Sequence, residues 1–489
     1  MNDFRNSVKQ VMVVFLFLFV ALITYIAYFQ AFKASDIAAD NGNRRIWAER
    51  NKVVRGTIYD RNGTALTSGE RTGTLTQSRQ YLYGDLFSHS IGYISETYGL
   101  SGLESTYDKE LTTYSSVGTS VRSVINDFSF DSLKKAFLSR DEEEEEIGNS
   151  IKTTLDIDIQ KAAYNALGNR KGSVVVLNPT TGEVLAMVSK PTFDPNNLSA
   201  AMEAANSGSG DGLFINRAIN GLYPPGSTFK AITTASALEN IPGVENEIFE
   251  DNGTLVFNKN YSLSNANGAA HGNINLKQAF AYSSNVVFGT LAGELGNDKL
   301  KATAESFGFN KKIPAIGFTM SESKFPTLES YEVGMIAQSG IGQSEILATP
   351  MEMALVASTI ANDGVMMNPK LVNEIVDMNG NVVQKIDSEE YGEAVDSSIA
   401  STIKDYMVNL VDSNGGMYYL QQYNVAGKTG TADHSDENGN AATPHSWFIG
   451  FAPADNPQIA VAVIVENGGW GAQVAAPVAG EVISVALNK

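Results

Sequence analysis

A serine and a lysine stand three residues apart in the segment "YPPGSTFKAI", as Ser227 and Lys230. Residues i and i+3 share one face of a helix, so the Lys230 amine can reach the Ser227 hydroxyl. A serine hydroxyl is a weak nucleophile at neutral pH and needs an adjacent base. A lysine is a base only when it is neutral, and burial together with a neighbouring cation lowers its pKa. The pair therefore predicts covalent catalysis, with Ser227 as the nucleophile and Lys230 as its base.

The S-x-x-K spacing is not specific by itself. It occurs four times, at Ser132/Lys135, Ser227/Lys230, Ser321/Lys324 and Ser401/Lys404. Only the pair at Ser227 follows a Pro-Pro-Gly turn and opens a strongly apolar helical segment. A helix N-terminus offers free backbone N–H groups and the positive end of the helix dipole to a developing oxyanion. We therefore expect the chemistry at Ser227.

A second motif, "SSN", contributes Ser283 and Asn285. The Ser283 hydroxyl can relay a proton between Lys230 and a leaving amine. The Asn285 amide can hold Lys230 and can accept from, or donate to, a peptide bond of the substrate. Both residues are therefore predicted to be catalytic.

A third motif, "KTG", lies in a predicted strand and is followed by a further threonine, Thr431. Lys428 adds a second cation, which lowers the pKa of the base and attracts a carboxylate. The hydroxyls of Thr429 and Thr431 can bind that carboxylate, and Gly430 lets a substrate backbone lie close against the strand. The backbone N–H groups of Ser227 and Thr431 are expected to form the oxyanion hole. This motif therefore predicts the substrate-binding side of the site.

Size and composition exclude several other classes of protein. The chain has 489 residues, which is more than one compact domain usually holds. A formal charge of −19 argues against nucleic acid as a partner, because binding it needs a basic surface. The chain has no cysteine, which excludes disulfides, thiol catalysis and cysteine-ligated metals. No cofactor is expected from these observations.

The N-terminus contains an uncharged apolar run over residues 11–29, "VMVVFLFLFVALITYIAYF". A helix of this length crosses a hydrocarbon layer of about 30 Å. Arg5 and Lys9 precede the run, so the positive-inside rule favours a cytoplasmic N-terminus and an external C-terminus. A cleaved signal peptide is the alternative, but its apolar region is usually shorter and no clear cleavage site follows. We expect an uncleaved membrane anchor.

Residues 30–150 form a mixed segment. A strand, a turn at Asn62-Gly63 and a second strand are predicted over residues 53–69. Residues 99–111 predict a turn that leads into a short helix. The acidic run "DEEEEE" at residues 141–146 is typical of a solvated loop and marks a domain boundary. An acidic docking site is the less favoured interpretation of this run.

From residue 151 the pattern changes to long apolar strands and helices. A strand with an amphipathic helix (residues 151–167) and a hairpin (residues 172–189) come first. Helical segments follow, including residues 351–362, and the chain ends in three strands and a closing apolar helix. Strands early and late with helices between them predict one antiparallel sheet that both ends of the domain complete. This is an α+β fold rather than a doubly wound parallel sheet.

The order S-x-x-K, S-x-N, K-T-G is that of penicillin-binding proteins and the related serine β-lactamases. Over nearly its whole length the sequence resembles a class B penicillin-binding protein of the compact PBPA type. The matching segments are "RGTIYDRNGTALT", "GLSGLESTYD", "LNPTTGEVLAMVSKPTFDPN", "NRAINGLYPPGSTFK", "YSSNVVF", "SGIGQSEILATPMEMALVASTIANDG" and "AGKTGTADH" with "TPHSWFIGFAPA". The resemblance implies a cytoplasmic tail (1–10), a signal-anchor (11–29), a small pedestal, dimerisation-like domain (30–150) and a transpeptidase domain of the penicillin-binding/serine β-lactamase fold (151–489).

The same resemblance implies a reaction. Ser227 attacks the penultimate D-alanyl carbonyl of a peptidoglycan stem peptide, D-Ala leaves, and an amine of a neighbouring stem resolves the acyl-enzyme as a crosslink. β-Lactams imitate the D-Ala-D-Ala end and trap Ser227. The substrates are stem peptides that derive from lipid-linked precursors, and the role lies in division or elongation. Class B proteins polymerise no glycan, so a polytopic membrane glycosyltransferase is the expected partner.

Three alternatives share some of these motifs. A β-lactamase needs a base that holds a deacylating water, and no such base is identified in the sequence. A D,D-carboxypeptidase would release the acyl-enzyme to water, whereas the pedestal and the anchor favour a crosslinking enzyme. A β-lactam sensor that has lost catalysis should carry a cytoplasmic signalling domain, and only about ten residues precede the anchor.

Other candidate sites have simpler explanations. His434 and His445, with Asp433 and Asp436, could hold a metal, but their spacing fits no known motif and a solvated loop is favoured. The segment "GIGQ" at residues 340–343 lacks the lysine of a phosphate-binding loop, so it predicts a turn. Trp447 and Phe448 are expected to pack within a strand rather than to stack on a ligand.

Overall fold

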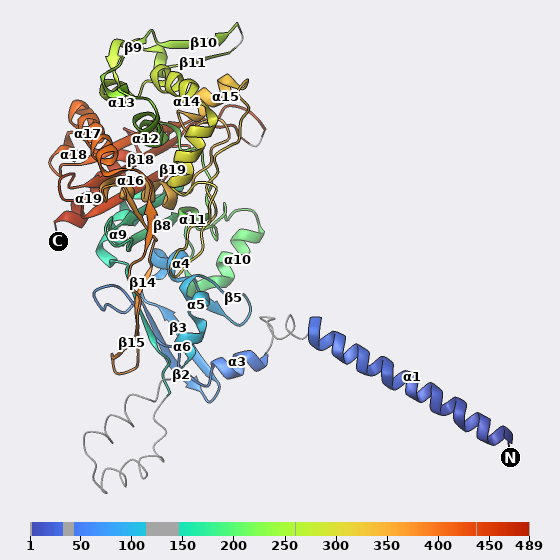
Figure 1. Ribbon diagram of the computed structural model, residues 1–489. Helices are drawn as coiled ribbons and strands as arrows, with labels where there is room; N and C mark the ends of the chain where they lie inside the picture. The colour runs from blue at the N-terminus through green and yellow to red at the C-terminus, as the bar shows by residue number, and fades with distance from the viewer. Residues whose placement is uncertain (1, 33–43, 114–145, 260, 437, 489) are drawn as a thin grey trace.

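The computed structural model describes residues 2–32, 44–113, 146–259, 261–436 and 438–488. Figure 1 shows three parts: a long N-terminal helix, a small lower part built on short strands, and a large upper part with the main sheet. Two features of the sequence lie largely or wholly outside the described residues. These are the acidic run, of which only Glu146 is described, and the pair Ser132/Lys135.

Helix α1 (Asn2–Phe32) contains the predicted anchor. Its segment Val8–Phe29 is long and apolar enough to cross a membrane, and none of that segment is buried against the rest of the chain. The helix extends away from the other two parts (Figure 1). The apolar side chains of this segment are therefore exposed, which fits a single-pass anchor.

The main sheet has five strands in the order β17-β18-β19-β7-β8, and every neighbouring pair is antiparallel. The strands are β7 (Gly172–Leu177), β8 (Val184–Lys190), β17 (Ala426–Ala432), β18 (His445–Ala452) and β19 (Ile459–Val465). The first two come from the start of the domain and the last three from its end, as the sequence pattern predicted. The K-T-G motif lies in β17, at the edge of this sheet.

Helices cover both faces of the main sheet. Every residue of β7, β8, β18 and β19 is buried, which requires a packed layer on each side. Helix α16 (Pro350–Ala361) packs against β18, β19 and β7, while α9 (Ile157–Leu167) and α19 (Ala475–Leu487) pack together and against β8 and β19. The predicted α+β transpeptidase fold is confirmed.

The nucleophile turn and its helix lie beside β17. They comprise the 3-10 helix η4 (Gly226–Phe229) and α12 (Lys230–Asn240). The other helices of this part are η3 (Pro195–Asn197), α10 (Leu198–Asn206), α11 (Arg217–Asn220), η5 (Val244–Asn246), η6 (Ala266–Gly268), α13 (Leu276–Tyr282), α14 (Asn285–Ser306), α15 (Val333–Ser339), α17 (Ser397–Ser413), η7 (Gly415–Met417) and α18 (Tyr418–Gln421).

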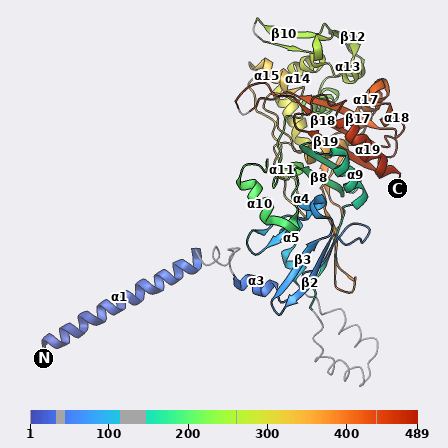
Figure 2. The same ribbon diagram turned by 180° about the vertical axis from the view of Figure 1, so that it is seen from behind.

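Two small hairpin-like sheets extend the upper part at the end far from the pedestal (Figures 1 and 2). They are β9 (Ile248–Asp251) with β12 (Gly272–Asn275), and β10 (Thr254–Asn258) with β11 (Tyr261–Ser264). A further pair joins β13 (Val365–Met367) and β16 (Glu390–Glu393). The chain enters α13 and α14 directly after β12, so this extension leads into the S-x-N motif.

The pedestal shares a sheet with a segment from far along the chain. Strand β1 (Ile58–Tyr59) pairs in parallel with β6 (Ser150–Thr153), and β14 (Val372–Val376) with β15 (Val382–Lys385) completes the order β1-β6-β14-β15. This hairpin therefore crosses the predicted domain boundary at residue 150. Its position in the lower part is visible in Figure 1.

The strand, turn and second strand predicted over residues 53–69 are present, with β1 before the turn and β2 (Thr67–Gly73) after it. The Asp60 carboxylate accepts from the N–H groups of Asn62 at 2.9 Å and Thr64 at 2.7 Å, which fixes the expected turn. An antiparallel bridge between Tyr59 and Ala65 joins the two segments, and the N–H of Leu66 donates to the carbonyl oxygen of Ile58 at 2.8 Å. Strand β1 also pairs in parallel with β6, a strand about ninety positions away that local sequence cannot identify.

The remaining pedestal elements surround a buried ion-pair cluster. They are α3 (Arg44–Arg50), β2 (Thr67–Gly73), β3 (Thr76–Tyr81), η1 (Gly84–Phe87), α4 (Ser88–Ile91), β4 (Ile94–Ser95), β5 (Gly99–Leu100), α5 (Gly102–Thr106) and α6 (Asp108–Thr112). The fully buried Glu104 carboxylate accepts from Arg55 Nε at 2.5 Å and from Arg79 Nε at 2.7 Å. Burial alone would raise the pKa of Glu104, but the two guanidinium groups outweigh it and lower that pKa. The two segments that resemble family pedestal motifs meet in this cluster.

Candidate active site

Ser227 lies on a turn that the surrounding chain holds at several points. Gly226 has a left-handed φ of 54°, and its N–H donates to the carbonyl oxygen of Gly342 at 2.9 Å. The indole Nε1 of Trp447 donates to the carbonyl oxygen of Pro224 at 3.0 Å. Ser227 itself is half-buried and lines a cavity. The predicted nucleophile therefore lies on a turn held by hydrogen bonds from both sides, and its side chain borders the cavity.

Lys230 is the first residue of α12 and is fully buried. Its Nζ donates to the carbonyl oxygen of Ser283 at 2.7 Å, to Ser283 Oγ at 3.2 Å and to Asn285 Oδ1 at 2.8 Å. Burial, and then the charge of Lys428, lower the pKa of Lys230 well below its usual range. The S-x-x-K and S-x-N motifs thus meet at one amine, and its lowered pKa favours the neutral form that a base requires.

Lys428 approaches the same serine from the opposite side. Its Nζ donates to Ser283 Oγ at 3.0 Å and to the carbonyl oxygen of Thr429 at 2.9 Å. The side chain is fully buried, and burial lowers the pKa of Lys428 to about 7. Ser283 Oγ is therefore in contact with both lysine amines, which is the arrangement that a proton relay requires.

Ser283 has an unusual backbone conformation. It follows α13 with φ 56° and ψ 41°, a left-handed geometry that is costly for a residue other than glycine. Ser284 then caps α14, because its side chain accepts from the N–H of Val287 at 3.1 Å. The tight connection between the two helices explains how Ser283 presents both its carbonyl oxygen and its hydroxyl to Lys230.

A cavity of about 550 Å³ opens in front of these groups. Its lining includes Ser227, Ser283, Asn285, Thr429 and Thr431. The structure therefore brings seven of the eight sequence-predicted residues to this cavity or directly behind it, the lysines lying below its floor. The lining also includes Asp433, which the sequence suggested only as a metal ligand, and residues that the sequence did not single out: Ser264, Asn265, Ala266, Tyr282, Pro444, Gly469, Trp470, Gly471 and Ala472.

Gly430, the remaining predicted residue, faces the nucleophile turn. A Cβ at this position would lie 2.9 Å from Thr228 Cγ2 and 3.0 Å from the carbonyl oxygen of Pro225. The structure thus gives a packing reason for this glycine, in addition to the substrate-binding reason predicted from the sequence. Close approach to the turn is what excludes a side chain here.

The "GIGQ" segment has a structural role that the sequence analysis missed. A Cβ on Gly342 would lie 2.1 Å from the carbonyl oxygen of Gly226, and Gly342 has a φ of 74°. Only glycine allows this approach to the nucleophile turn. The clustered glycines were the signal that could have indicated it.

The histidines near the site form a stack. The rings of His434 and His445 lie 3.8 Å apart at an interplanar angle of 17°, and burial lowers the pKa of His445 to about 4. Within the described residues no group of three or more His, Cys, Asp or Glu side chains is arranged to hold a metal ion. Trp447 and Phe448 are fully buried in β18, so the predicted strand packing is confirmed.

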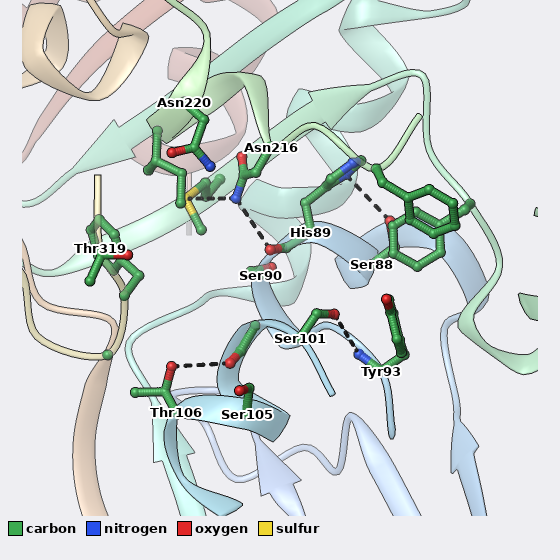
Figure 3. A pocket seen from close by; sticks show the side chains of 17 residues that line it. Ser88, His89, Ser90, Tyr93, Ser101, Ser105, Thr106, Asn216, Asn220 and Thr319 are labelled. Atoms are coloured by element: carbon green, nitrogen blue, oxygen red, sulfur yellow. Dashed lines mark hydrogen bonds between the residues drawn. The ribbon is translucent and has the colours of Figure 1, made fainter. Parts of the chain in front are cut away.

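A second cavity, of about 330 Å³, lies between the pedestal and the upper part (Figure 3). Its lining has hydroxyl, amide and aromatic side chains but no Asp, Glu, Lys or Arg. Asn216 Nδ2 donates to the carbonyl oxygen of His89 at 3.2 Å, and Ser101 Oγ accepts from the N–H of Tyr93 at 3.2 Å. Burial lowers the pKa of His89 to about 4. Ser88 Oγ and His89 Nδ1 lie 3.4 Å apart in its lining, and the cavity is a polar seam between the two parts.

Comparison with known proteins places this geometry in a family. Residues 172–484 match the penicillin binding protein transpeptidase domain, and residues 55–129 match the penicillin binding protein A dimerisation domain. The peptidoglycan D,D-transpeptidase PbpA of Mycolicibacterium smegmatis is 34% identical over 99% of each chain.

Solved structures give the same result. The D,D-transpeptidase domain of a peptidoglycan glycosyltransferase from Eggerthella lenta superimposes with a TM-score of 0.77 at 36% identity, covering 89% of this chain and 99% of that one. Penicillin-binding protein A from M. tuberculosis, solved as a ceftriaxone acyl-enzyme complex, gives a TM-score of 0.78 at 30% identity, covering 90% and 100%. With the fold, the three motifs and these relatives in agreement, the chain belongs to the penicillin-binding protein transpeptidase family.

Proposed function

We propose that this chain crosslinks peptidoglycan as a serine D,D-transpeptidase, with Ser227 as the nucleophile and Lys230 as its base. The observation that carries the proposal is the position of Lys230 Nζ. It is buried, its pKa is lowered, and it bonds both Ser283 and Asn285 one helical turn from Ser227. Such an amine can accept a proton from a serine and return it to a leaving group.

Acylation is proposed to follow from this arrangement. Ser227 Oγ attacks the penultimate D-alanyl carbonyl while its proton passes to Lys230 Nζ. The oxyanion of the tetrahedral intermediate is held by the backbone N–H groups of Ser227 and Thr431. The proton then passes through Ser283 Oγ to the departing D-Ala amine, the C–N bond breaks, and an acyl-enzyme remains. An acceptor amine of a neighbouring stem reverses these steps, loses a proton to Lys230 and forms the crosslink.

The β17 edge is proposed to bind the carboxylate of the substrate. Thr429 and Thr431 line the cavity, and Lys428 lies directly behind them. An edge strand also offers unpaired backbone groups to an extended peptide. A β-lactam presents a similar carboxylate beside its reactive carbonyl, so the same residues would hold the antibiotic that traps Ser227.

Covalent labelling tests the nucleophile. A fluorescent penicillin should label the full-length protein, and Ser227→Ala should abolish the label while the far-UV circular dichroism stays unchanged. Ser401→Ala is the matched control, because Ser401 stands in another S-x-x-K pair on the exposed side of α17. Mass spectrometry should place the adduct on the peptide that contains Ser227. An adduct on any other serine would show that the assignment is wrong.

We further propose that α1 anchors the chain with its N-terminus in the cytoplasm, and that residues 30–150 form a pedestal below a transpeptidase domain over residues 151–489. The absence of charge from residues 11–29 and the basic residues before them support this arrangement. A polytopic membrane glycosyltransferase is the proposed partner, contacted through α1 and the pedestal. The family resemblance supports this partner.

Co-purification from membranes tests the partner. The full-length protein should capture a glycosyltransferase, and a chain that begins at Asn43 should capture it less well. Equal capture by both chains would show that α1 only holds the protein at the membrane and does not contact the glycosyltransferase. Polymerisation of lipid-linked disaccharide by the isolated protein would contradict the proposal that a separate protein polymerises the glycan.

A further inference from the structure

Two buried polar side chains lie behind the S-x-N motif, outside the predicted catalytic set. Asp251 ends β9, and Asn265 follows β11; their exposed fractions are 0% and 5%. Asn265 Nδ2 donates to Asp251 Oδ1 at 2.7 Å, to Asp251 Oδ2 at 2.9 Å and to the carbonyl oxygen of Ala269 at 2.7 Å. The donor end of this amide is therefore fully used within the extension.

The acceptor end of the same amide holds the start of α14. Asn265 Oδ1 accepts from the backbone N–H of Asn285 at 2.7 Å, from the backbone N–H of Val286 at 3.1 Å and from Ser284 Oγ at 3.4 Å. These are donors that no intrahelical carbonyl can satisfy. One amide thus joins the extension to the helix whose first residue, Asn285, bonds Lys230.

His271 completes the network and connects it to the cavity. Its Nδ1 lies 2.7 Å from Asp251 Oδ2, and its ring stacks on Tyr282 at 4.6 Å and an interplanar angle of 6°. Burial would raise the pKa of Asp251, but hydrogen bonds, that with His271 foremost, outweigh it and lower that pKa. Asp251 is therefore a carboxylate, which accepts from His271, Asn265 and the N–H of Gly253.

We propose that Asp251, Asn265 and His271 are positioning residues for the transpeptidation site. They fix the first turn of α14 and the left-handed Ser283, so that Asn285 Oδ1 and the two oxygens of Ser283 stay on Lys230 Nζ. This inference rests on the proposed function of Lys230 as the base. A displacement of about 1 Å at such a contact lowers a rate by about a hundredfold.

The hydrogen-bond polarity makes the proposal specific. Residue 265 must donate at one end and accept at the other, which an amide does and a carboxylate does not. Asn265→Asp would set two carboxylates against each other. Asp251→Asn would leave two amides without an anion between them. The double variant Asp251→Asn/Asn265→Asp restores one carboxylate and one amide, and residue 265 can still accept from the α14 N–H groups, but it loses the hydrogen bond to the carbonyl oxygen of Ala269.

The test is the rate of acylation by a fluorescent penicillin, measured on the full-length protein across pH. Each single variant should acylate about tenfold to a hundredfold more slowly, and the double variant should recover part of that loss. The Asp251 charge raises the pKa of Lys230, so Asp251→Asn should also move the acid limb of the pH profile to lower pH. A loss of packing alone would give neither the recovery nor this shift.

A matched control exists in the pedestal sheet. Asp377 is also buried and accepts from the amide Nδ2 of Asn381 at 2.9 Å, but it lies in the turn between β14 and β15. Asp377→Asn should leave the acylation rate unchanged. His271→Gln, which can still donate to Asp251, should lose less than His271→Ala.

Two outcomes would overturn the inference. One is a folded Asp251→Asn or Asn265→Asp variant that acylates at the wild-type rate. The other is a double variant that is as slow as the slower single variant. If the single variants do not fold, the double variant and His271→Gln carry the test. Failure of the proposed function itself would be recognised separately, since Ser227→Ala would then still be labelled.

Discussion

At the scale of single residues, the central feature of the site is that both buried lysines contact the same hydroxyl, that of Ser283. Ser283 Oγ lies 3.2 Å from Lys230 Nζ and 3.0 Å from Lys428 Nζ. We expect Lys230→Ala to lower the acylation rate by about 10²–10⁴, the usual contribution of a general base. Lys428→Ala should lower it less and should weaken binding of the substrate carboxylate. Stopped-flow acylation with a penicillin measures both, and a near wild-type rate for Lys230→Ala would exclude it as the base.

Lys428 also affects stability in a pH-dependent way. Burial lowers its pKa from 10.5 to about 7 in the folded state. Between these values the unfolded chain binds a proton that the folded chain does not, so the free energy of unfolding rises with pH across that window. Below pH 7 both states carry the proton, and the full free-energy cost of burying the charged Lys428 side chain is present. Each pKa unit corresponds to about 1.4 kcal/mol, part of which the two hydrogen bonds of Lys428 offset.

Lys428→Met should therefore be more stable than the wild type at pH 7. We expect a gain of about 1–3 kcal/mol at pH 7 that shrinks as the pH approaches 10. Denaturant unfolding of both proteins at pH 7 and pH 9 measures it. A variant that is less stable at pH 7, or a gain that grows with pH, would contradict this account. The variant should lose acylation. The wild-type Lys428 thus serves function although its burial lowers the stability of the fold.

At the scale of elements, the pedestal depends on one buried charge. Glu104 at α5 is bonded by Arg55 and Arg79, which come from the chain before β1 and from β3. Removing one member of a buried ionic cluster leaves uncompensated charge and costs about 3–5 kcal/mol. We expect Glu104→Ala to lower the free energy of unfolding by about that amount.

The control for Glu104 is an exposed ion pair in the same part of the chain. Glu49 and Lys52 are 2.8 Å apart with side-chain exposures of 63% and 57%. Glu49→Ala should change the free energy of unfolding by less than about 1 kcal/mol. Thermal unfolding compares the two variants, and a Glu104→Ala protein as stable as Glu49→Ala would show that the cluster is not structural.

At the scale of the whole molecule, the anchor and the catalytic part are physically separate. Residues 8–29 bury nothing against the rest of the chain, and α1 extends away from it (Figure 1). We expect a chain that begins at Arg44 to fold without detergent and to be acylated by penicillin at the full-length rate. Acylation kinetics of both proteins measure this. A large loss of rate in the shortened chain would show that α1 supports the site directly.

Several features of this protein could be predicted from its sequence alone. The apolar run over residues 11–29, the hairpin at residues 172–189 and the three motifs are local patterns, because their meaning depends on residue type and spacing within a few turns of chain. For the same reason the turn at Asp60 and the helix after Ser227 could be predicted. The roles predicted for Lys230, Ser283 and Lys428 rest on chemistry that needs just these groups, and they stay predictions.

Only the tertiary structure decided which distant segments meet. It paired β1 with β6, and it brought β14 and β15 down into the pedestal sheet. It also set Asp251 and Asn265 behind Asn285, a contact that no spacing rule indicates. Strand pairing and the hydrogen bonds of buried polar groups depend on partners far away in the chain. The free energy of these contacts depends on the packing of the whole fold, so a short stretch of sequence does not predict them.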